Sequence, residues 1–272
     1  MADVSQPGTA LMSAPDDVHV RTDRDDGVAT VELVNAKSMN ILGSAAIRQL
    51  TAEFRAIPSD PDIRVAVLRG SGDRAFIGGA DIGEMATLDR AGAETFIRGL
   101  AGLCEAVRSC PVPVIARLAG WCLGGGLEVA LSCDLRIAAV SARFGMPEVA
   151  IGIPSVIHAA LMPAMIGASR TAWLLLTGST IEADRAERWG IVHEVVPESD
   201  LDQRIADLTR TLTRYGPHVV RQQKRLLADW YDVDARSAIE DSIRQFGLAF
   251  LTGEPQQHMT DFLERQADRA RP

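Results

Sequence analysis

A run of three glycines followed by a carboxylate is the feature of this sequence best suited to chemistry. Gly124–Gly126 leaves the backbone free to adopt positive φ, and the apolar residues of Leu127–Leu131 indicate that a helix begins there. A glycine turn at a helix start presents unpaired N–H groups and the positive end of the helix dipole, which suit a developing negative charge. Glu128 lies in the first turn, within reach of whatever those groups hold.

The same spacing allows a purely structural interpretation, and both stay open on spacing alone. Gly124–Gly126 could serve only to let a strand and a helix pack tightly, with Glu128 as a favourable first-turn carboxylate. Neither G-x-G-x-x-G nor G-x-x-x-x-G-K-[ST] occurs, so the two common nucleotide fingerprints are absent. We therefore do not expect a phosphate clamped by a P-loop.

Composition bounds the fold and the partners. A chain of 272 residues allows one large domain or a core with a small appendage, and 47% hydrophobic residues suffice for a sizeable core. The net charge of −8 argues against a nucleic-acid or membrane partner, because such partners need a basic surface. Val149–Ser169 has no charged residue, but Pro154 and Pro163 make it a poor membrane helix, so we expect it to be buried.

Cysteine and histidine spacing narrows the chemistry further. No cysteine pair has C-x-x-C spacing and no signal peptide is evident, which favours a reducing, cytoplasmic location. The histidines show neither H-E-x-x-H nor clustered spacing, so no metal site is expected. The residues concerned are Cys104, Cys110, Cys122, Cys133, His19, His158, His193, His218 and His258.

Alternating strand and helix patterns predict an α/β fold. A hairpin is predicted over Val18–Asp23 and Val28–Leu33, around the turn Asp25–Gly27. Strands are predicted over Ile63–Arg69, Val114–Leu118 and Asp134–Val140, and a long loop over Gly70–Gly79. Helices are predicted from an N-cap at Ser44 to about Ile57, across Arg90–Cys110, and near Ser169–Thr177.

From about Asp200 the patterns are helical alone, near residues 200–214, 217–231, 235–251 and 255–268. We therefore divide the chain into three parts. Residues 1–16 are predicted to be a flexible N-terminal tail, residues 17–199 an α/β core and residues 200–272 a C-terminal helical region.

A second glycine-bearing loop, Phe76–Ile82, completes a specific combination of motifs. With Gly124–Gly126, Glu128 and Phe144–Glu148, it closely resembles the enoyl-CoA hydratase/isomerase (crotonase) family. The resemblance runs from about Val18 to Arg265. It also includes Cys133-Asp134, Trp189–Val192, Val195–Pro197, Phe246, Phe250 and Asp261–Arg265.

The resemblance implies the fold and the assembly. Residues 17–199 are expected to form the family's spiral of ββα units, and residues 200–272 a helical oligomerisation region. A homotrimer or a dimer of trimers is implied. The partner is an acyl-CoA substrate, and no cofactor is expected beyond coenzyme A as part of that substrate.

The resemblance also implies that the N–H groups of Ala80 and Gly125 form an oxyanion hole for a thioester carbonyl. Addition next to a thioester places charge on its oxygen as an enolate, and each preorganised donor is worth roughly 3 kcal/mol of barrier. Glycine at 125 lets the backbone approach closely, and alanine at 80 is too small to obstruct it.

Glu128 and Glu148 match the two catalytic glutamates of the family's hydratases. Adding water to a trans-2-enoyl-CoA needs a base for the water and an acid for the α-carbon, and two carboxylates can supply both. We assign water activation to Glu128 and proton donation to Glu148. The alternative for Glu148, taken without the resemblance, is an exposed loop carboxylate after Pro147.

For coenzyme A the resemblance implies two segments that act mainly through backbone groups. Lys37 and Arg265 could meet phosphates, although solvated surface charge is the simpler interpretation of each. The expected substrate-binding residues are Ala36, Lys37, Ser38, Asn40, Ala80, Asp81, Ile82, Gly83 and Gly124.

The sequence departs from the family's P-G-A-G-G-T run after the second glutamate and reads Gly152–Ala159 there, apolar and bulkier. This leaves open another reaction of the family: isomerisation, hydrolysis or decarboxylation of an acyl-CoA. A serine hydrolase using Ser155 and His158 is a separate alternative, weakened by the absence of G-x-S-x-G. A non-catalytic acyl-CoA-binding protein is disfavoured by the paired glutamates. His158 is expected to be a packed helix residue.

Overall fold

The computed structural model describes residues 19–34 and 39–269. Strands β1 (Val20–Asp25) and β2 (Val28–Leu33) pair antiparallel, as predicted. Asp26 and Gly27 between them have φ of 43° and 77°, the positive values that a tight two-residue hairpin turn requires. The predicted tail at residues 1–16 lies outside the described residues.

The main sheet has six strands in the order β1-β2-β3-β5-β7-β10, parallel from β2 onward. Its remaining strands are β3 (Val65–Gly70), β5 (Val114–Leu118), β7 (Leu135–Ala139) and β10 (Glu194–Val196). Both faces are covered, since Val65 and Val67 pack toward α8 (Leu201–Thr213) while Ala66 and Leu68 join the larger core on the other face. Burial on both faces explains the continuous apolar runs.

A second sheet of four short strands stands beside the first, in the order β4-β6-β8-β9. Its members are β4 (Ala75–Ile77), β6 (Trp121–Leu123), β8 (Arg143–Gly145) and β9 (Thr180–Glu182). Strands β3, β5 and β7 each continue into a short strand of this sheet before the chain turns into helical structure. This repetition is the spiral of ββα units, so the expected fold class is confirmed, although the predicted loop Gly70–Gly79 contains β4.

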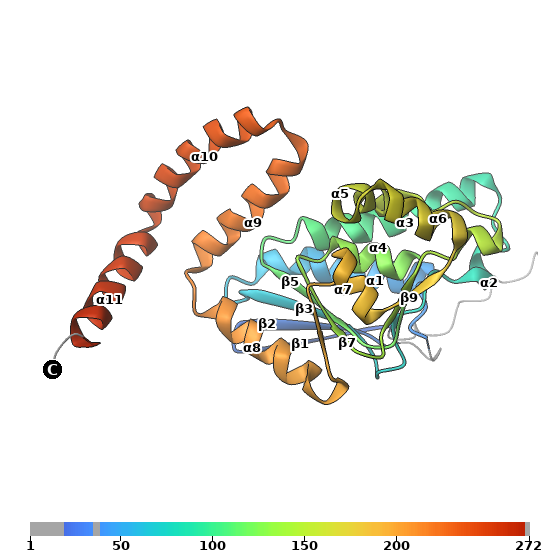
Figure 1. Cartoon of the computed structure of the whole chain (residues 1–272), viewed down its shortest axis with the longest axis horizontal. Helices are drawn as coiled ribbons and strands as arrows, with labels where there is room; N and C mark the ends of the chain where they lie inside the picture. The colour runs from blue at the N-terminus through green and yellow to red at the C-terminus, as the bar shows by residue number, and fades with distance from the viewer. Residues whose placement is uncertain (1–18, 35–38, 270–272) are drawn as a thin grey trace, which may run out of the picture.

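Helices α1 (Ser44–Ala56), α3 (Arg90–Arg108) and α4 (Gly125–Ser132) lie over the large-core face of the main sheet, as Figure 1 shows. The short helix α2 (Ile82–Met85) follows the β4 loop. Ser44 was predicted to cap α1, but Gly43 holds the cap position. Instead, the N–H and hydroxyl of Ser44 donate to the carboxylate of Glu84 on α2, which ties that loop to the start of α1.

The uncharged segment Val149–Ser169 is expected to be buried, and the structure shows that this expectation is wrong for several of its residues. It holds two 3-10 turns (Glu148–Ile151 and Ile157–Leu161) and the short helix α5 (Met162–Ile166). Its residues are not uniformly buried: Val149, Ile151, Ile153 and Val156 are 39–48% exposed. Within the described residues, no helix is both long enough and apolar enough to cross a membrane.

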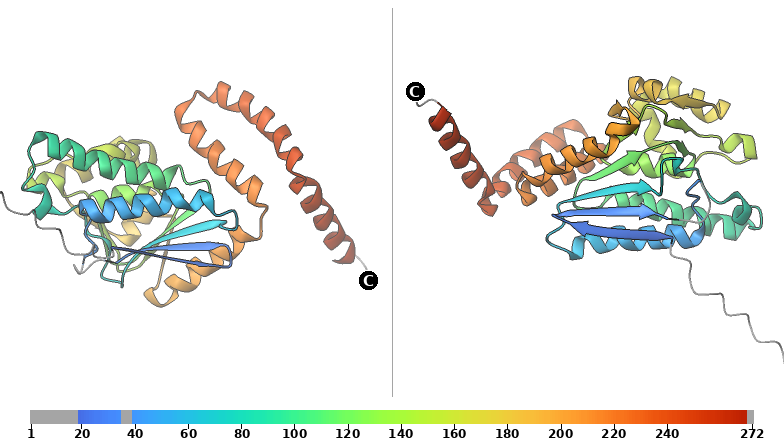
Figure 2. Two further views of the ribbon diagram at one scale, coloured as in Figure 1. Left: turned by 180° about the vertical axis from the view of Figure 1, so that it is seen from behind. Right: turned by 90° about the horizontal axis from the view of Figure 1, so that it is seen from below.

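Helix α6 (Ala168–Thr177) ends near its predicted boundary, and α7 (Ala183–Trp189) leads into β10. After α8, three helices form an arm that projects from the core (Figure 1 and Figure 2). They are α9 (Pro217–Asp232), α10 (Ala235–Ala249) and α11 (Glu254–Arg269). Lys224 anchors the arm, since its Nζ lies 2.9 Å from the Val112 carbonyl and 2.7 Å from Asp134.

Candidate active site

One cavity brings together the two glycine loops and the two glutamates. Its volume is ≈ 160 Å³, and it lies between the loop after β4, the start of α4 and the segment after β8. The residues that line it are Gly78, Gly79, Ala80, Ile82, Met85, Phe96, Ile97, Leu100, Leu123, Gly124, Gly125, Glu128, Pro147, Glu148, Ala150, Ile151, Ile153, Pro154, Ser155 and Val156. Two carboxylic acids therefore sit in an otherwise largely apolar pocket.

The three glycines at the start of α4 have separate physical roles. Gly124 has φ 52° and ψ −125°, and a Cβ on it would collide with Oε1 of Glu148. A Cβ on Gly126 would collide with the carbonyl oxygen of Ile77 in β4. The structural interpretation of the glycine run is thus correct for Gly126, which permits tight packing, and Gly124 makes room for a glutamate.

Ala80 and Gly125, the two residues expected to form an oxyanion hole, both line the cavity. Gly125 is the first residue of α4, so its N–H has no partner within the helix. Ala80 forms an isolated bridge with Leu42, in which Leu42 N–H donates to Gly79 and Asp81 N–H donates to Leu42, each at 2.9 Å. Neither bond of that bridge uses the Ala80 N–H. An arrangement of this kind can stabilise an oxyanion.

Glu128 is buried, with 3% of its surface exposed. Its Oε1 accepts a hydrogen bond from the Ala159 N–H at 2.9 Å. Burial raises the pKa of Glu128 to about 8, which the Ala159 N–H opposes and the nearby Glu148 reinforces. This carboxyl can therefore both hold and release a proton close to neutral pH.

Glu148 begins the 3-10 turn that follows β8 and is half-buried, so it is not an exposed loop carboxylate. Its Oε2 accepts a hydrogen bond from the Ser155 hydroxyl at 3.0 Å. Burial raises the pKa of Glu148, and its own backbone N–H and Ser155 oppose the increase.

The segment Gly152–Ala159, which departs from the family pattern, donates a hydrogen bond to each of the two glutamates. Ser155 donates to Glu148 and Ala159 donates to Glu128. Between them Ile157 has a φ of 40°, a left-handed conformation that is costly for a β-branched residue. The sequence showed this segment only as a departure, and nothing in its residue types indicated that it supplies these two donors.

The pairing required for a serine hydrolase is not formed in the described part of the chain. The Ser155 hydroxyl donates to Glu148 rather than to His158. His158 lies in the 3-10 turn Ile157–Leu161, with its Nδ1 buried and without a partner. Burial lowers the pKa of His158, as expected for a packed histidine.

The expected coenzyme A residues are only partly brought together. Ala80, Ile82 and Gly124 line the cavity, whereas Asp81, Gly83 and Asn40 do not. The expectations for Ala36, Lys37 and Ser38 fall outside the described residues.

Asn40 and Asp81 serve the fold instead. Asn40 is buried, and its Nδ2 donates to the carbonyls of Ala75 at 2.7 Å and Ser71 at 3.1 Å. The Asp81 side chain caps α2, accepting from the N–H groups of Gly83 and Glu84. Both side chains therefore have structural roles and shape the loop that carries Ala80, and the expectation that the backbone of these residues contacts coenzyme A stays a prediction.

All four cysteines are buried free thiols. Over residues 19–34 and 39–269, no three His, Cys, Asp or Glu side chains lie together in a way that could hold a metal ion.

Known proteins resemble this chain in sequence and in structure. The enoyl-CoA hydratase/isomerase family matches residues 23–269. A crotonyl-CoA hydratase of Syntrophomonas wolfei is 32% identical over 247 residues, covering 90% of this chain and 94% of the relative. A short-chain-enoyl-CoA hydratase of Clostridium acetobutylicum is 31% identical over 251 residues, covering 91% and 95%.

The same similarity appears in a solved structure. The crystal structure of an enoyl-CoA hydratase from Bacillus anthracis superposes with a TM-score of 0.87 at 28% identity, covering 91% of this chain and 96% of that one. The matched region contains every strand from β2 to β10, the glycine loops and the two glutamates. The chain therefore belongs to the enoyl-CoA hydratase/isomerase family.

Proposed function

We propose that this protein is an enoyl-CoA hydratase that adds water across the double bond of a trans-2-enoyl-CoA. The observation that carries the proposal is the presence of Glu128 and Glu148 in the one cavity that the backbone of Ala80 and Gly125 also lines. The names of the relatives agree with it. Coenzyme A enters as part of the substrate, and the reaction needs no further cofactor.

In this proposal the N–H groups of Ala80 and Gly125 hold the thioester oxygen. Hydration forms a bond between the water oxygen and the β-carbon, and the electron pair of the double bond moves into the thioester as an enolate. Each N–H donor that stabilises this oxygen is worth roughly 3 kcal/mol of barrier.

The two glutamates exchange protons with the substrate. Glu128 takes a proton from the attacking water, and Glu148 gives a proton to the α-carbon as the enolate electron pair returns. The pair therefore ends with as many protons as it began with. Dehydration of the 3-hydroxyacyl product reverses each transfer, so that Glu148 becomes the base and Glu128 the acid.

The burial and hydrogen bonding of Glu128 and Glu148 support the inference that the two carboxyls together hold one proton at neutral pH. Burial raises the pKa of Glu128 to about 8, whereas donation from Ser155 limits the rise in the pKa of Glu148. Glu128 protonated and Glu148 ionised is the form from which dehydration starts. Hydration starts from the form in which the same proton lies on Glu148.

The small volume of the cavity favours a substrate with a short acyl chain. Its ≈ 160 Å³ is well below the roughly 300–1,000 Å³ of pockets for drug-sized ligands. Phe96, Leu100 and Val156 are among the apolar side chains that line it, and two of these are buried in the core. We infer that crotonyl-CoA is hydrated with a higher kcat/KM than long-chain enoyl-CoAs.

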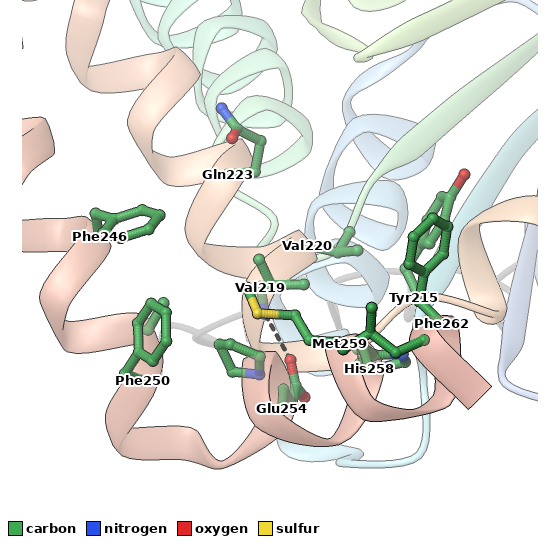
Figure 3. Close-up of a pocket in the computed structure, with 14 residues that line it drawn as sticks. Tyr215, Val219, Val220, Gln223, Phe246, Phe250, Glu254, His258, Met259 and Phe262 are labelled. Atoms are coloured by element: carbon green, nitrogen blue, oxygen red, sulfur yellow. Dashed lines mark hydrogen bonds between the residues drawn. The ribbon is translucent and has the colours of Figure 1, made fainter. Parts of the chain in front are cut away.

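The arm supports self-assembly. An apolar groove of ≈ 790 Å³ runs between α9, α10 and α11, and Figure 3 shows Phe246, Phe250, Met259 and Phe262 among the side chains around it. Phe246 is 68% exposed and Phe262 54% exposed. Single chains rarely leave such surface open to water, so we infer that other copies of the chain cover it in a homotrimer or a dimer of trimers.

Two further inferences complete the proposal. The free, buried cysteines favour a reducing, cytoplasmic location. The net charge of −8 leaves nucleic acid and anionic membranes as unfavourable partners.

A panel of acyl-CoAs tests the reaction. We expect the purified protein to hydrate short trans-2-enoyl-CoAs, followed by loss of the conjugated absorbance, and to release no free coenzyme A from saturated acyl-CoAs. Thiol release without hydration would favour the hydrolase alternative, and migration of a 3-enoyl double bond without hydration would favour an isomerase.

A further inference from the structure

Ser155 is the one hydroxyl-bearing side chain among the residues that line the cavity, all of which belong to the described part of the chain. It lies in the segment between the 3-10 turn at Glu148–Ile151 and the next turn at Ile157–Leu161. The proton transfers described above do not use it. Its hydroxyl nevertheless contacts the catalytic pair, donating to Oε2 of Glu148 at 3.0 Å.

That hydrogen bond makes the two oxygens of Glu148 inequivalent. Oε2 accepts from Ser155, whereas Oε1 lies against Gly124, where a Cβ would collide with it. Gly124 immediately precedes Gly125, whose N–H is assigned to the thioester oxygen. Oε1 is therefore the oxygen that lies against the start of α4, and Oε2 is the oxygen bonded to the supporting segment.

We propose that Ser155 is a positioning residue that holds Oε2 of Glu148, so that Oε1 is the atom that gives and takes the proton of the α-carbon. This rests on the proposed hydratase function. In hydration the O–H bond at Oε1 breaks, the proton joins the α-carbon, and the electron pair of that O–H bond stays on Glu148. The Ser155 hydroxyl then stabilises the resulting carboxylate through Oε2.

The effect of the Ser155 hydroxyl on the pKa of Glu148 can be measured because of the groups that surround Glu148. Glu128 and Glu148 are the only titratable side chains among the residues that line the cavity, and the Glu128 carboxyl is itself held by the Ala159 N–H. A donor to a carboxylate favours the ionised form. Removal of Ser155 should therefore raise the pKa of Glu148 and shift the low-pH side of the activity profile upward.

The test compares kcat, KM and the pH profile of crotonyl-CoA hydration in the wild type, Ser155→Ala and Ser155→Thr. For Ser155→Ala we expect kcat to fall about tenfold, with KM within about twofold, because a hydrogen bond to a charged group is lost without a change in the pocket wall. The low-pH limb should move to higher pH. Ser155→Thr keeps a hydroxyl and should restore both kcat and the limb.

Ser109→Ala is the matched control, because its hydroxyl also accounts for a single hydrogen bond, donated to the Glu105 carbonyl outside the cavity. It should behave as the wild type. A wild-type rate and pH profile for Ser155→Ala would overturn the role of Ser155. Equal losses in Ser155→Ala and Ser155→Thr, with no shift of the limb, would also overturn it by indicating a packing role. Failure of the wild type to hydrate any enoyl-CoA would instead contradict the proposed function.

Discussion

Glu128 and Glu148 come from different kinds of local structure and meet in one apolar cavity. Glu128 is placed by the helix that the glycine run starts, and Glu148 by the turn after β8. Because the cavity offers few polar groups, each carboxyl relies on a single donor from the segment Ser155–Ala159 and on the other glutamate. The proton sharing that we propose would follow from this environment rather than from either residue alone.

Activity should fall as the pH rises above about 8. Burial raises the pKa of Glu128 to about 8, so above that value the pair loses its one proton and no acid remains for either direction. At low pH the pair gains a second proton and no base remains. Initial rates of crotonyl-CoA hydration across this range check the bell shape; a rate that keeps rising well above pH 8 would contradict it.

Gly124→Ala should reduce kcat/KM for hydration by a factor of at least about 10². Its φ of 52° and ψ of −125° disfavour any side chain, and a Cβ would displace Oε1 of Glu148. Gly102→Ala in α3 is the control, because a Cβ there meets nothing within 4 Å. That variant should keep wild-type activity and gain up to roughly 1 kcal/mol of stability.

At the scale of elements, the loop that carries Ala80 is held by contacts to its neighbours. Glu84 on α2 accepts from the N–H and hydroxyl of Ser44 at the start of α1, and Leu42 bridges to Ala80. The position of one proposed oxyanion donor thus depends on an acidic side chain that is not itself in the cavity lining.

Glu84→Ala should lower the free energy of unfolding by about 1 kcal/mol, the usual cost of losing a helix N-terminal acceptor. We also expect a lower kcat for hydration, because the Ala80 N–H becomes less well positioned. Urea denaturation and steady-state kinetics measure the two effects. The control is Glu94→Ala, which removes an exposed pair with Arg90 and should change stability by no more than roughly 0.5 kcal/mol. Equal stability of the two variants would argue against this role.

How far the sequence predicts these elements depends on their length. The strand Val114–Leu118 and the long helices α3, α9, α10 and α11 match their predicted bounds closely, because each carries several periods of its apolar pattern. Strands β4, β6, β8 and β9 have three residues each, too few to show alternation, and were missed. Together they form the second sheet, from which three of the site's segments emerge.

The glycine loops and glutamates of the candidate site could be predicted from the sequence, but the groups that donate hydrogen bonds to the glutamates could not. Two glycine loops and two glutamates could be recognised from their combined resemblance to the family's motifs, whereas spacing alone left their roles open. The donors at Ser155 and Ala159 could not be, because they depend on the backbone of Ile157 and on contacts across the fold. The structural hydrogen bonds of Asn40 and Asp81 could not be predicted for a similar reason, since side-chain hydrogen bonds within the protein cannot be read from residue type.

In the whole molecule, the arm differs from the core in the amount of apolar surface that it exposes. The core buries its own apolar residues, whereas α10 and α11 expose Phe246, Phe262 and Leu263 by 54–68%. The arm is fixed to the core mainly through α9, by contacts such as Lys224 to Asp134. Its two outer helices thus expose the apolar surface that we propose a second copy covers.

Phe262→Asp should convert the assembly to smaller species, because burying a carboxylate in an apolar interface is strongly unfavourable. Light scattering after size-exclusion chromatography measures the mass. Thr260→Asp, an exposed position on the same helix, is the matched control and should leave the mass unchanged. A wild-type protein that runs as a monomer at micromolar concentration would contradict the proposed assembly.

We propose that the two glutamates exchange protons with an enoyl thioester, and the hydration rate of the Glu148→Gln variant is a direct test of this exchange. The amide keeps the size of the side chain and can still accept from Ser155, but it cannot give a proton to the α-carbon. We expect the kcat for crotonyl-CoA hydration to be lower by a factor of about 10² to 10⁴, with little change in substrate binding. Turnover close to that of the wild type would contradict it.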